Sequence, residues 1–146
     1  MITNQTFLIV EDEENDIFFL KHAMKKTGIN NPVQVVQNGQ EAIDYLSGTG
    51  KFGDRNMYPL PSIIFLDLKL PQVHGLEVLK WIREHPSLPQ LVVLVLTSSS
   101  LHGDIQRAYR LGANSYVVKP TSQEKLIEIV SAFREWWLRH NEPPPQ

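Results

Sequence analysis

The amino-acid sequence predicts an α/β protein built around one doubly wound parallel sheet of five strands. Five short apolar runs, each too short for a helix, alternate along the chain with segments in which apolar residues recur every three or four positions. Gly or Pro stands close to most boundaries between these segments, as is typical where strands and helices end. Because strand–helix–strand crossovers are right-handed, helices are expected on both faces of the sheet.

The short apolar runs are the predicted strands, at residues 7–10, 33–36, 63–66, 91–96 and 115–118. The third run, between Pro61 and Pro71, begins with four consecutive apolar residues, which is typical of a strand that is covered on both faces. It ends in Asp67. In an open parallel sheet this is the edge where ligands bind, so Asp67 is a candidate functional carboxylate.

The segments between the strands are the predicted helices, at residues 15–26, 40–46, 76–85, 105–111 and 122–138. The last begins at Ser122, a residue type favoured at helix N-caps, and is the longest. Residues 47–61 do not fit this alternation. They contain three Gly and two Pro residues, and we interpret them as a long surface loop and as a tolerated insertion.

Composition and charge limit the classes of function. The 146 residues suit a single domain, with a core at about 7–138 and a Pro-rich tail at 141–146. The net charge of −2, without a long run of either sign, gives no indication of a nucleic-acid or membrane partner. The chain has no cysteine, no stretch long enough to span a membrane and no secretory signal, so we expect a cytoplasmic protein.

Four of the five predicted strands end in a group capable of chemistry. Glu11 and Asp12 follow the first strand, Asp67 follows the third, Thr97 the fourth and Lys119 the fifth. Parallel strands end at the same edge of a sheet. We therefore expect three carboxylates, a hydroxyl and an ammonium group to meet in one crevice.

This set of groups indicates phosphoryl chemistry at a magnesium site. Neighbouring carboxylates repel one another unless a cation is present, and Mg²⁺ prefers oxygen ligands. The lack of cysteine and of a nearby histidine pair argues against zinc. An ion, an ammonium and a hydroxyl would neutralise and hydrogen-bond a phosphoryl group. No Gly-rich phosphate loop is present, so the carboxylate of Asp67 becomes the candidate phosphoryl acceptor.

The ordered set of motifs resembles the receiver domain of two-component response regulators. The motifs are the acidic pair Glu11-Asp12, the segment FLDLKLP followed by Gly75, then LTSSS and SYVVKP. The resemblance covers about residues 7–138. It implies a flavodoxin-like fold with the strand order 2-1-3-4-5. It also implies a phosphoacceptor signalling protein that promotes its own phosphorylation and dephosphorylation, and not an enzyme.

The resemblance also implies the roles of the metal and phosphate ligands. Asp67 would be the phosphorylated residue. Mg²⁺ would be held by Glu11, Asp12, Asp67 and the backbone carbonyl of Lys69. Lys119 would pair with the phosphoryl group.

Three further features of the family concern the switch that reads the phosphoryl group. Thr97 would bind that group and shift toward it. Tyr116 matches the aromatic switch residue, whose ring would then move inward. The Lys119–Pro120 peptide bond would be cis. These changes would alter the surface around the fourth helix, the fifth strand and the fifth helix.

The inserted residues 47–61 and the lack of an output domain are most similar to stand-alone regulators associated with phytochrome kinases. This implies a sensor histidine kinase as a partner, with a phytochrome as the candidate, docked near the first helix.

In the last helix, one broad face carries Leu126, Ile129, Val130, Phe133, Trp136 and Trp137. Both tryptophans cannot point straight into the sheet. Exposed aromatics there would favour a homodimer through the fourth and fifth helices.

Two other functions compete with a phosphorylated receiver. A phosphatase of the haloacid dehalogenase type would carry its nucleophile after the first strand and a second Asp two residues later, whereas Lys69 is the residue two after Asp67. A receiver-like docking module would work without phosphorylation. Such degenerate receivers usually lose the acceptor, the acidic pair or the lysine, and this chain retains all of them.

Overall fold

The computed structural model describes residues 5–88 and 90–142, and its centre is a five-stranded parallel sheet. The strands are β1 (Phe7–Val10), β2 (Val33–Val36), β3 (Ile63–Leu66), β4 (Val92–Thr97) and β5 (Ser115–Val118). Their order is β2-β1-β3-β4-β5, with every neighbouring pair parallel. The predicted fold class and strand order are confirmed.

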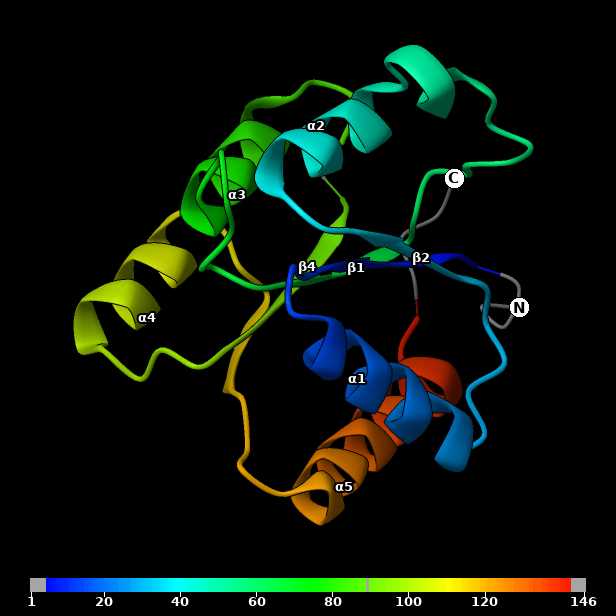
Figure 1. Cartoon of the computed structure of the whole chain (residues 1–146), viewed down its shortest axis with the longest axis vertical. Coiled ribbons are helices and arrows are strands. Elements are labelled where there is room, and N and C mark those ends of the chain that lie inside the picture. Colours follow the sequence, from blue (N-terminus) through cyan, green and yellow to red (C-terminus); the bar gives the residue numbers. More distant parts are fainter. Residues whose placement is uncertain (1–4, 89, 143–146) are drawn as a thin grey trace.

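The helices cover both faces of this sheet. They are α1 (Glu14–Lys26), α2 (Gly39–Ser47), α3 (Gly75–Glu84), α4 (His102–Arg110) and α5 (Gln123–Arg134). Figure 1 shows α2, α3 and α4 on one face and α1 and α5 on the other. A short 3-10 helix, η1 (Gly50–Gly53), follows α2, and a π-helical segment, η2 (Glu135–His140), continues α5.

Each central strand contributes to two separate cores, because successive side chains of a strand point to opposite faces. In β1, Leu8 and Val10 pack in the core beneath α2, α3 and α4, whereas Phe7 and Ile9 pack beneath α1 and α5. Both faces are therefore apolar. This explains why β1 and β3 are apolar at every position, as is typical of strands covered by helices on both sides.

The two adjacent tryptophans at the end of the chain have different environments. Trp137 is 2% exposed and stacks on Phe133, which itself makes edge contacts with Phe7 and Phe65 in the sheet. Trp136 is 52% exposed. Consecutive helical residues point about 100° apart, so only one of the pair can face the sheet. Trp137 takes the buried position and Trp136 the surface position.

The inserted segment at 47–61 packs through its aromatic side chains against α2. Phe52 in η1 is buried and contacts the rings of Tyr45 and Tyr58. The Tyr45 hydroxyl donates a hydrogen bond to the carbonyl of Pro59 at 2.7 Å, and burial raises the pKa of Tyr45 to about 12. The insertion thus adds an aromatic cluster to one end of the α2 layer.

Arg55 connects this segment to the end of α2. Its guanidinium donates hydrogen bonds to the carbonyls of Tyr45 at 2.7 Å, Leu46 at 2.9 Å and Tyr58 at 3.2 Å. The carbonyls of Tyr45 and Leu46 belong to the last turn of α2, where a helix leaves its carbonyls without intrahelical partners. A cation at this end also complements the helix dipole.

Replacing Arg55 with methionine should lower the free energy of unfolding by about 1–3 kcal/mol, since half-buried carbonyls would lose a charged donor. Methionine retains an unbranched side chain but no donor. The measurement is urea-induced unfolding. Arg110→Met, at an exposed position in the last turn of α4, is the matched control and should change stability by less than about 0.5 kcal/mol. Equal effects of the two substitutions would show that the Arg55 hydrogen bonds contribute no stability.

Two further predictions concern the C-terminal tail and the absence of a membrane-spanning stretch. The Pro-rich tail predicted at 141–146 lies outside the described residues from position 143 onward. Among the residues that the structure describes, no helix has the length and apolar character needed to cross a bilayer.

Candidate functional site

The carboxylates predicted at the strand ends meet at one edge of the sheet. β1 and β3 pair with Val10 opposite Leu66, so Glu11 and Asp67 follow at the same level. The Asp67 backbone N–H donates to the Val10 carbonyl at 3.0 Å, which extends the pairing beyond both strands. Glu11, Asp12 and Asp67 each present an oxygen within 4.8 Å of the others. Glu11 and Asp67 are both only 5% exposed.

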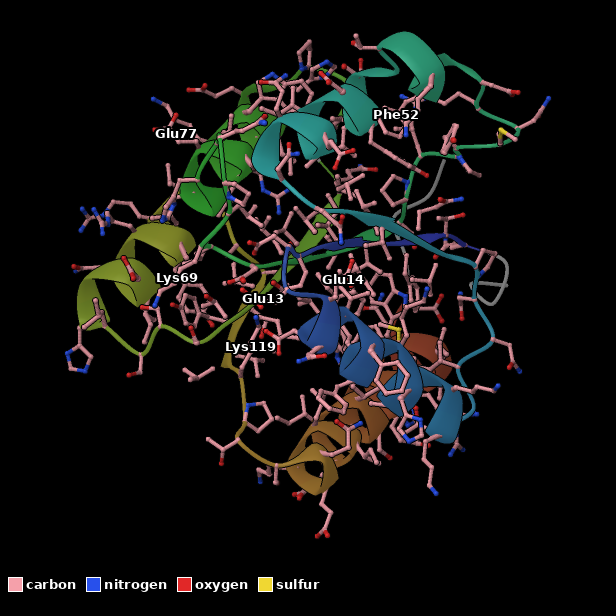
Figure 2. The ribbon with its side chains drawn as sticks, viewed as in Figure 1. Glu13, Glu14, Phe52, Lys69, Glu77 and Lys119 are labelled. Carbon is pink, nitrogen blue, oxygen red and sulfur yellow. The ribbon has the colours of Figure 1, made fainter. Side chains whose placement is uncertain are left out.

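Lys119 reaches these carboxylates from the end of β5. Its Nζ donates hydrogen bonds to Glu11 Oε1, to Asp16 Oδ2 at 2.8 Å and to Asp67 Oδ2 at 3.2 Å. Figure 2 shows Lys119 beside the start of α1, in agreement with its hydrogen bond to Asp16 in the first turn of that helix. One ammonium group therefore joins β1, α1 and β3 at the site.

The prediction of a cis Lys119–Pro120 bond is wrong, because the described residues contain no cis peptide bond. The trans isomer is intrinsically favoured at an X–Pro bond by about 0.5–1 kcal/mol. With the trans bond, the Lys119 ammonium still contacts three carboxylates.

The site has more negative than positive charge. Burial raises the pKa of Glu11 to about 7, because desolvation outweighs the hydrogen bonds from Lys119 and from the Glu13 backbone, and the charge of Asp67 raises it further. Burial alone would lower the pKa of Lys119, but its hydrogen bonds to Asp16 and Glu11 raise it. A hard divalent ion fits a cluster of carboxylate oxygens with a single ammonium group.

Thr97 supplies a free hydroxyl at the same edge. It is the last residue of β4, which lies between β3 and β5, and its backbone carbonyl accepts a hydrogen bond from the Lys119 N–H at 2.8 Å. The side chain is 0% exposed, and its Oγ1 has no hydrogen-bond partner among the described residues. A buried hydroxyl without a partner costs about 1–3 kcal/mol, so such groups in native proteins mark strained or functional positions.

Lys69 and Gly75 shape the loop that carries Asp67. The Lys69 N–H donates to Asp67 Oδ1 at 3.3 Å, and its side chain is exposed (Figure 2). A Cβ atom on Gly75 would lie 2.3 Å from the Asp67 carbonyl oxygen and 2.5 Å from Leu68 Cα. Only glycine allows α3 to begin this close to the Asp67 backbone. Ligation by the Lys69 carbonyl stays a prediction.

Tyr116 holds the loop that follows Thr97. The ring is partly buried against the core under α2, α3 and α4, and its hydroxyl donates to the Ser99 carbonyl at 2.9 Å. The Ser99 hydroxyl in turn donates to Asp104 Oδ2 at 2.6 Å. Hydrogen bonds from Ser99 and Arg107 hold the pKa of Asp104 below its usual value. Tyr116 is predicted from the sequence, whereas its connection to Asp104 through Ser99 is seen only in the structure.

Asp16 is the site residue that the sequence analysis misses entirely. It lies in the first turn of α1, where an acidic residue has an ordinary explanation in the helix dipole. The available signal is its position, five residues after Glu11 and at the start of the helix that follows the acidic pair. That signal is weak, because its partner Lys119 is 103 positions away in the chain.

Comparisons with known proteins agree with this geometry. Residues 7–131 match the response regulator receiver domain family. The "Probable methanogenesis regulatory protein FilR2" of Methanothrix harundinacea is 36% identical over 137 residues, covering 94% of this chain and 86% of that protein. The response regulator Rcp1 of Synechocystis is 31% identical over 134 residues, covering 92% of this chain and 89% of that protein.

Solved structures show the same similarity in three dimensions. The phosphorylated cyanobacterial phytochrome response regulator RcpA has a TM-score of 0.89 and 32% identity, and the similarity covers 97% of this chain and 99% of that one. The Mn²⁺-bound form of response regulator Rcp1 has a TM-score of 0.87 and 30% identity, with the same coverage. From its fold, its strand-end residues and these similarities, the chain belongs to the response regulator receiver domain family of two-component systems, and phytochrome response regulators are among its relatives.

Proposed function

We propose that this protein is a response regulator in which Asp67 accepts a phosphoryl group from a sensor histidine kinase. The observation that carries the proposal is the environment of Asp67. Its carboxylate is buried, contacts the Lys119 ammonium at 3.2 Å and lies in a cluster with two further carboxylates. A nucleophilic carboxylate with a cation beside it is suited to aspartyl-phosphate chemistry.

Asp67, Lys119 and Thr97 act directly on the transferred phosphoryl group in this proposal. An Asp67 oxygen attacks the phosphorus atom of the kinase phosphohistidine, and the phosphorus–nitrogen bond breaks with its electron pair on the imidazole. Lys119 exchanges its hydrogen bond to Asp67 for one to a phosphoryl oxygen. Thr97 donates its unpartnered hydroxyl to another phosphoryl oxygen.

The residues that would hold a divalent ion are Glu11, Asp12, Asp67 and the carbonyl of Lys69. When bound, Mg²⁺ would supply positive charge against the phosphoryl oxygens. The carboxylate cluster supports this assignment, and so does the relative Rcp1, for which an Mn²⁺-bound structure is known. Hydrolysis of the phosphorylated Asp67 by water would return the protein to its starting state.

We also propose that the phosphoryl group is read out through β4, α4, β5 and α5. If Thr97 moves toward the phosphoryl group, the loop that follows it must adjust, and Tyr116 contacts that loop through the Ser99 carbonyl. The far side of β5 faces an apolar groove of about 470 Å³ that contains Val117, Phe133 and the exposed Trp136. This surface suits a protein partner or a second copy of the chain.

The kinase partner is expected to contact α1. Phe18 and Phe19 are 63% and 42% exposed there, and they lie one turn or less from Asp16 at the mouth of the site. Exposed aromatic residues beside an active site are favourable contacts for a protein partner. The similarity to phytochrome response regulators makes a phytochrome the candidate kinase.

Phosphorylation by acetyl phosphate, a small phosphodonor, tests the chemistry without the kinase. We expect a Mg²⁺-dependent phosphate adduct in the intact mass of the wild type. Asp67→Asn should abolish the adduct, because an amide is not a nucleophile for phosphorus. Asp54→Asn, at the end of η1 in the inserted segment, removes the same charge at an exposed residue outside the carboxylate cluster and should leave the adduct unchanged. A change in elution volume on phosphorylation would show that phosphorylation also changes the oligomeric state.

If no adduct forms with or without Mg²⁺, the proposal is wrong and the protein is instead a docking module that does not use phosphorylation. If an adduct forms on Asp67→Asn as readily as on the wild type, another residue is the acceptor.

A further inference from the structure

The proposed function places two opposing requirements on the position of the Lys119 ammonium. Its ammonium must lie close to Asp67 in order to meet the incoming phosphoryl group. Yet the acceptors that it contacts on β1 and β3, Glu11 and Asp67, are carboxylates that a divalent ion would also need. An ammonium and a metal ion both seek the same carboxylate oxygens, so the lysine is a built-in competitor of the ion.

Asp16 offers the ammonium an acceptor outside this competition. Its Oδ2 lies 2.8 Å from Lys119 Nζ, nearer than the 3.2 Å to Asp67 Oδ2, although Glu11 Oε1 lies nearer still. The cluster of oxygens suited to a metal consists of Glu11, Asp12 and Asp67 and does not include Asp16. An ammonium group has three N–H donors, and in this structure one of them is directed to α1 instead of to the metal cluster.

The position of Asp16 in the fold suits this role. It lies in the first turn of α1, at the mouth of a pocket that also contains Lys119, Pro120 and Gln123. Its side chain is 41% exposed, whereas that of Lys119 is 17% exposed. The contact therefore binds the lysine from the solvent side of the site.

We propose that Asp16 is a positioning residue that draws the Lys119 ammonium away from the metal-binding carboxylates, so that Lys119 and a divalent ion can occupy the site together. The proposal rests on the proposed function, because it assigns the carboxylate cluster to a divalent ion. It concerns the hydrogen bond between Asp16 on α1 and Lys119 at the end of β5.

Removing the Asp16 charge should weaken Mg²⁺ binding for two reasons that can be separated. The first is general, since any lost negative charge near the site lowers the attraction for a cation. The second is specific, since without Asp16 the ammonium would move onto Glu11 and Asp67 and compete with the ion. The specific effect requires Lys119, whereas the general one does not.

The experiment is titration of the protein with MgCl₂ by isothermal titration calorimetry. We expect Asp16→Asn to weaken Mg²⁺ affinity about tenfold, the effect of losing one short charge-assisted contact. The matched control is Glu14→Gln, which removes the same charge from the same turn of α1 at an exposed residue. It should change the affinity by no more than about twofold, as expected for a solvated surface charge.

A double-mutant cycle with Lys119 tests whether Asp16 affects Mg²⁺ binding through Lys119. Lys119→Met should strengthen Mg²⁺ binding, because it removes the competing cation. In that background Asp16→Asn should reproduce only the small effect of Glu14→Gln. Thermal unfolding of each variant checks that all are folded, and a purely structural role for Asp16 would not produce a coupling that depends on Lys119.

The outcomes distinguish this inference from the proposed function. If wild type binds no Mg²⁺, the assignment of the metal site is wrong and the inference falls with it. If wild type binds Mg²⁺ but Asp16→Asn behaves like Glu14→Gln, the inference alone is wrong. An Asp16→Asn effect that persists undiminished in Lys119→Met would also overturn it, because Asp16 would then act on the ion directly.

Discussion

Thr97→Val should slow phosphorylation by acetyl phosphate by about 10²–10³-fold, the usual cost of removing one donor to a developing charge. The same substitution should leave the protein equally stable or raise its free energy of unfolding by about 1 kcal/mol. Valine has the shape of threonine, and the hydroxyl that it lacks is fully buried without a partner among the described residues. Intact-mass kinetics measures the first effect, and urea unfolding measures the second.

Two controls make the result specific to the Thr97 hydroxyl. Thr97→Ser keeps the hydroxyl and loses a methyl group, so it should phosphorylate at near the wild-type rate but unfold more easily. Thr121→Val makes the same chemical change at an exposed residue beside Pro120 and should alter neither quantity. If Thr97→Val destabilises the protein and phosphorylates normally, the hydroxyl is a structural group and not a ligand of the phosphoryl group.

Trp137→Ala should lower the free energy of unfolding by about 3–5 kcal/mol, the range observed when a large aromatic residue is removed from a core. Trp137 is 2% exposed and stacks on Phe133, which packs against the sheet. Trp136→Ala removes the same side chain from the adjacent position, which is 52% exposed, and should cost less than about 1 kcal/mol. Urea unfolding of both variants measures the difference.

The same pair of variants also bears on assembly. If α5 and η2, which contains Trp136, form an interface in a homodimer, Trp136→Ala should shift the elution volume toward that of a monomer while the fold is retained. Equal losses of stability at the two positions would contradict the assignment of Trp137 to the core and Trp136 to the surface.

Much of the fold follows from the sequence alone. Each predicted strand is a short apolar run, and the observed strands begin and end within one residue of the predicted bounds. The close placement of Glu11, Asp67, Thr97 and Lys119 also follows from their positions in the sequence. Each follows or ends a strand, and the ends of parallel strands coincide in space whatever the details of packing. Fold class and the set of residues at the sheet edge are therefore local properties of the chain.

The tertiary structure decides which side chains become partners. Periodicity places Trp136 and Trp137 on the same broad face, and only packing against Phe133 selects the one that is buried. Arg55 lies in an inserted segment, and its role depends on the end of α2 folding back beside it.

Asp16 is an example at the site of a residue whose partner is decided only by the tertiary structure. Its sequence context indicates only a helix start, whereas its partner Lys119 arrives from the end of β5 when the sheet is complete. Propensity and periodicity describe interactions between residues a few positions apart. A hydrogen bond between residues 103 positions apart depends on the path of the whole chain.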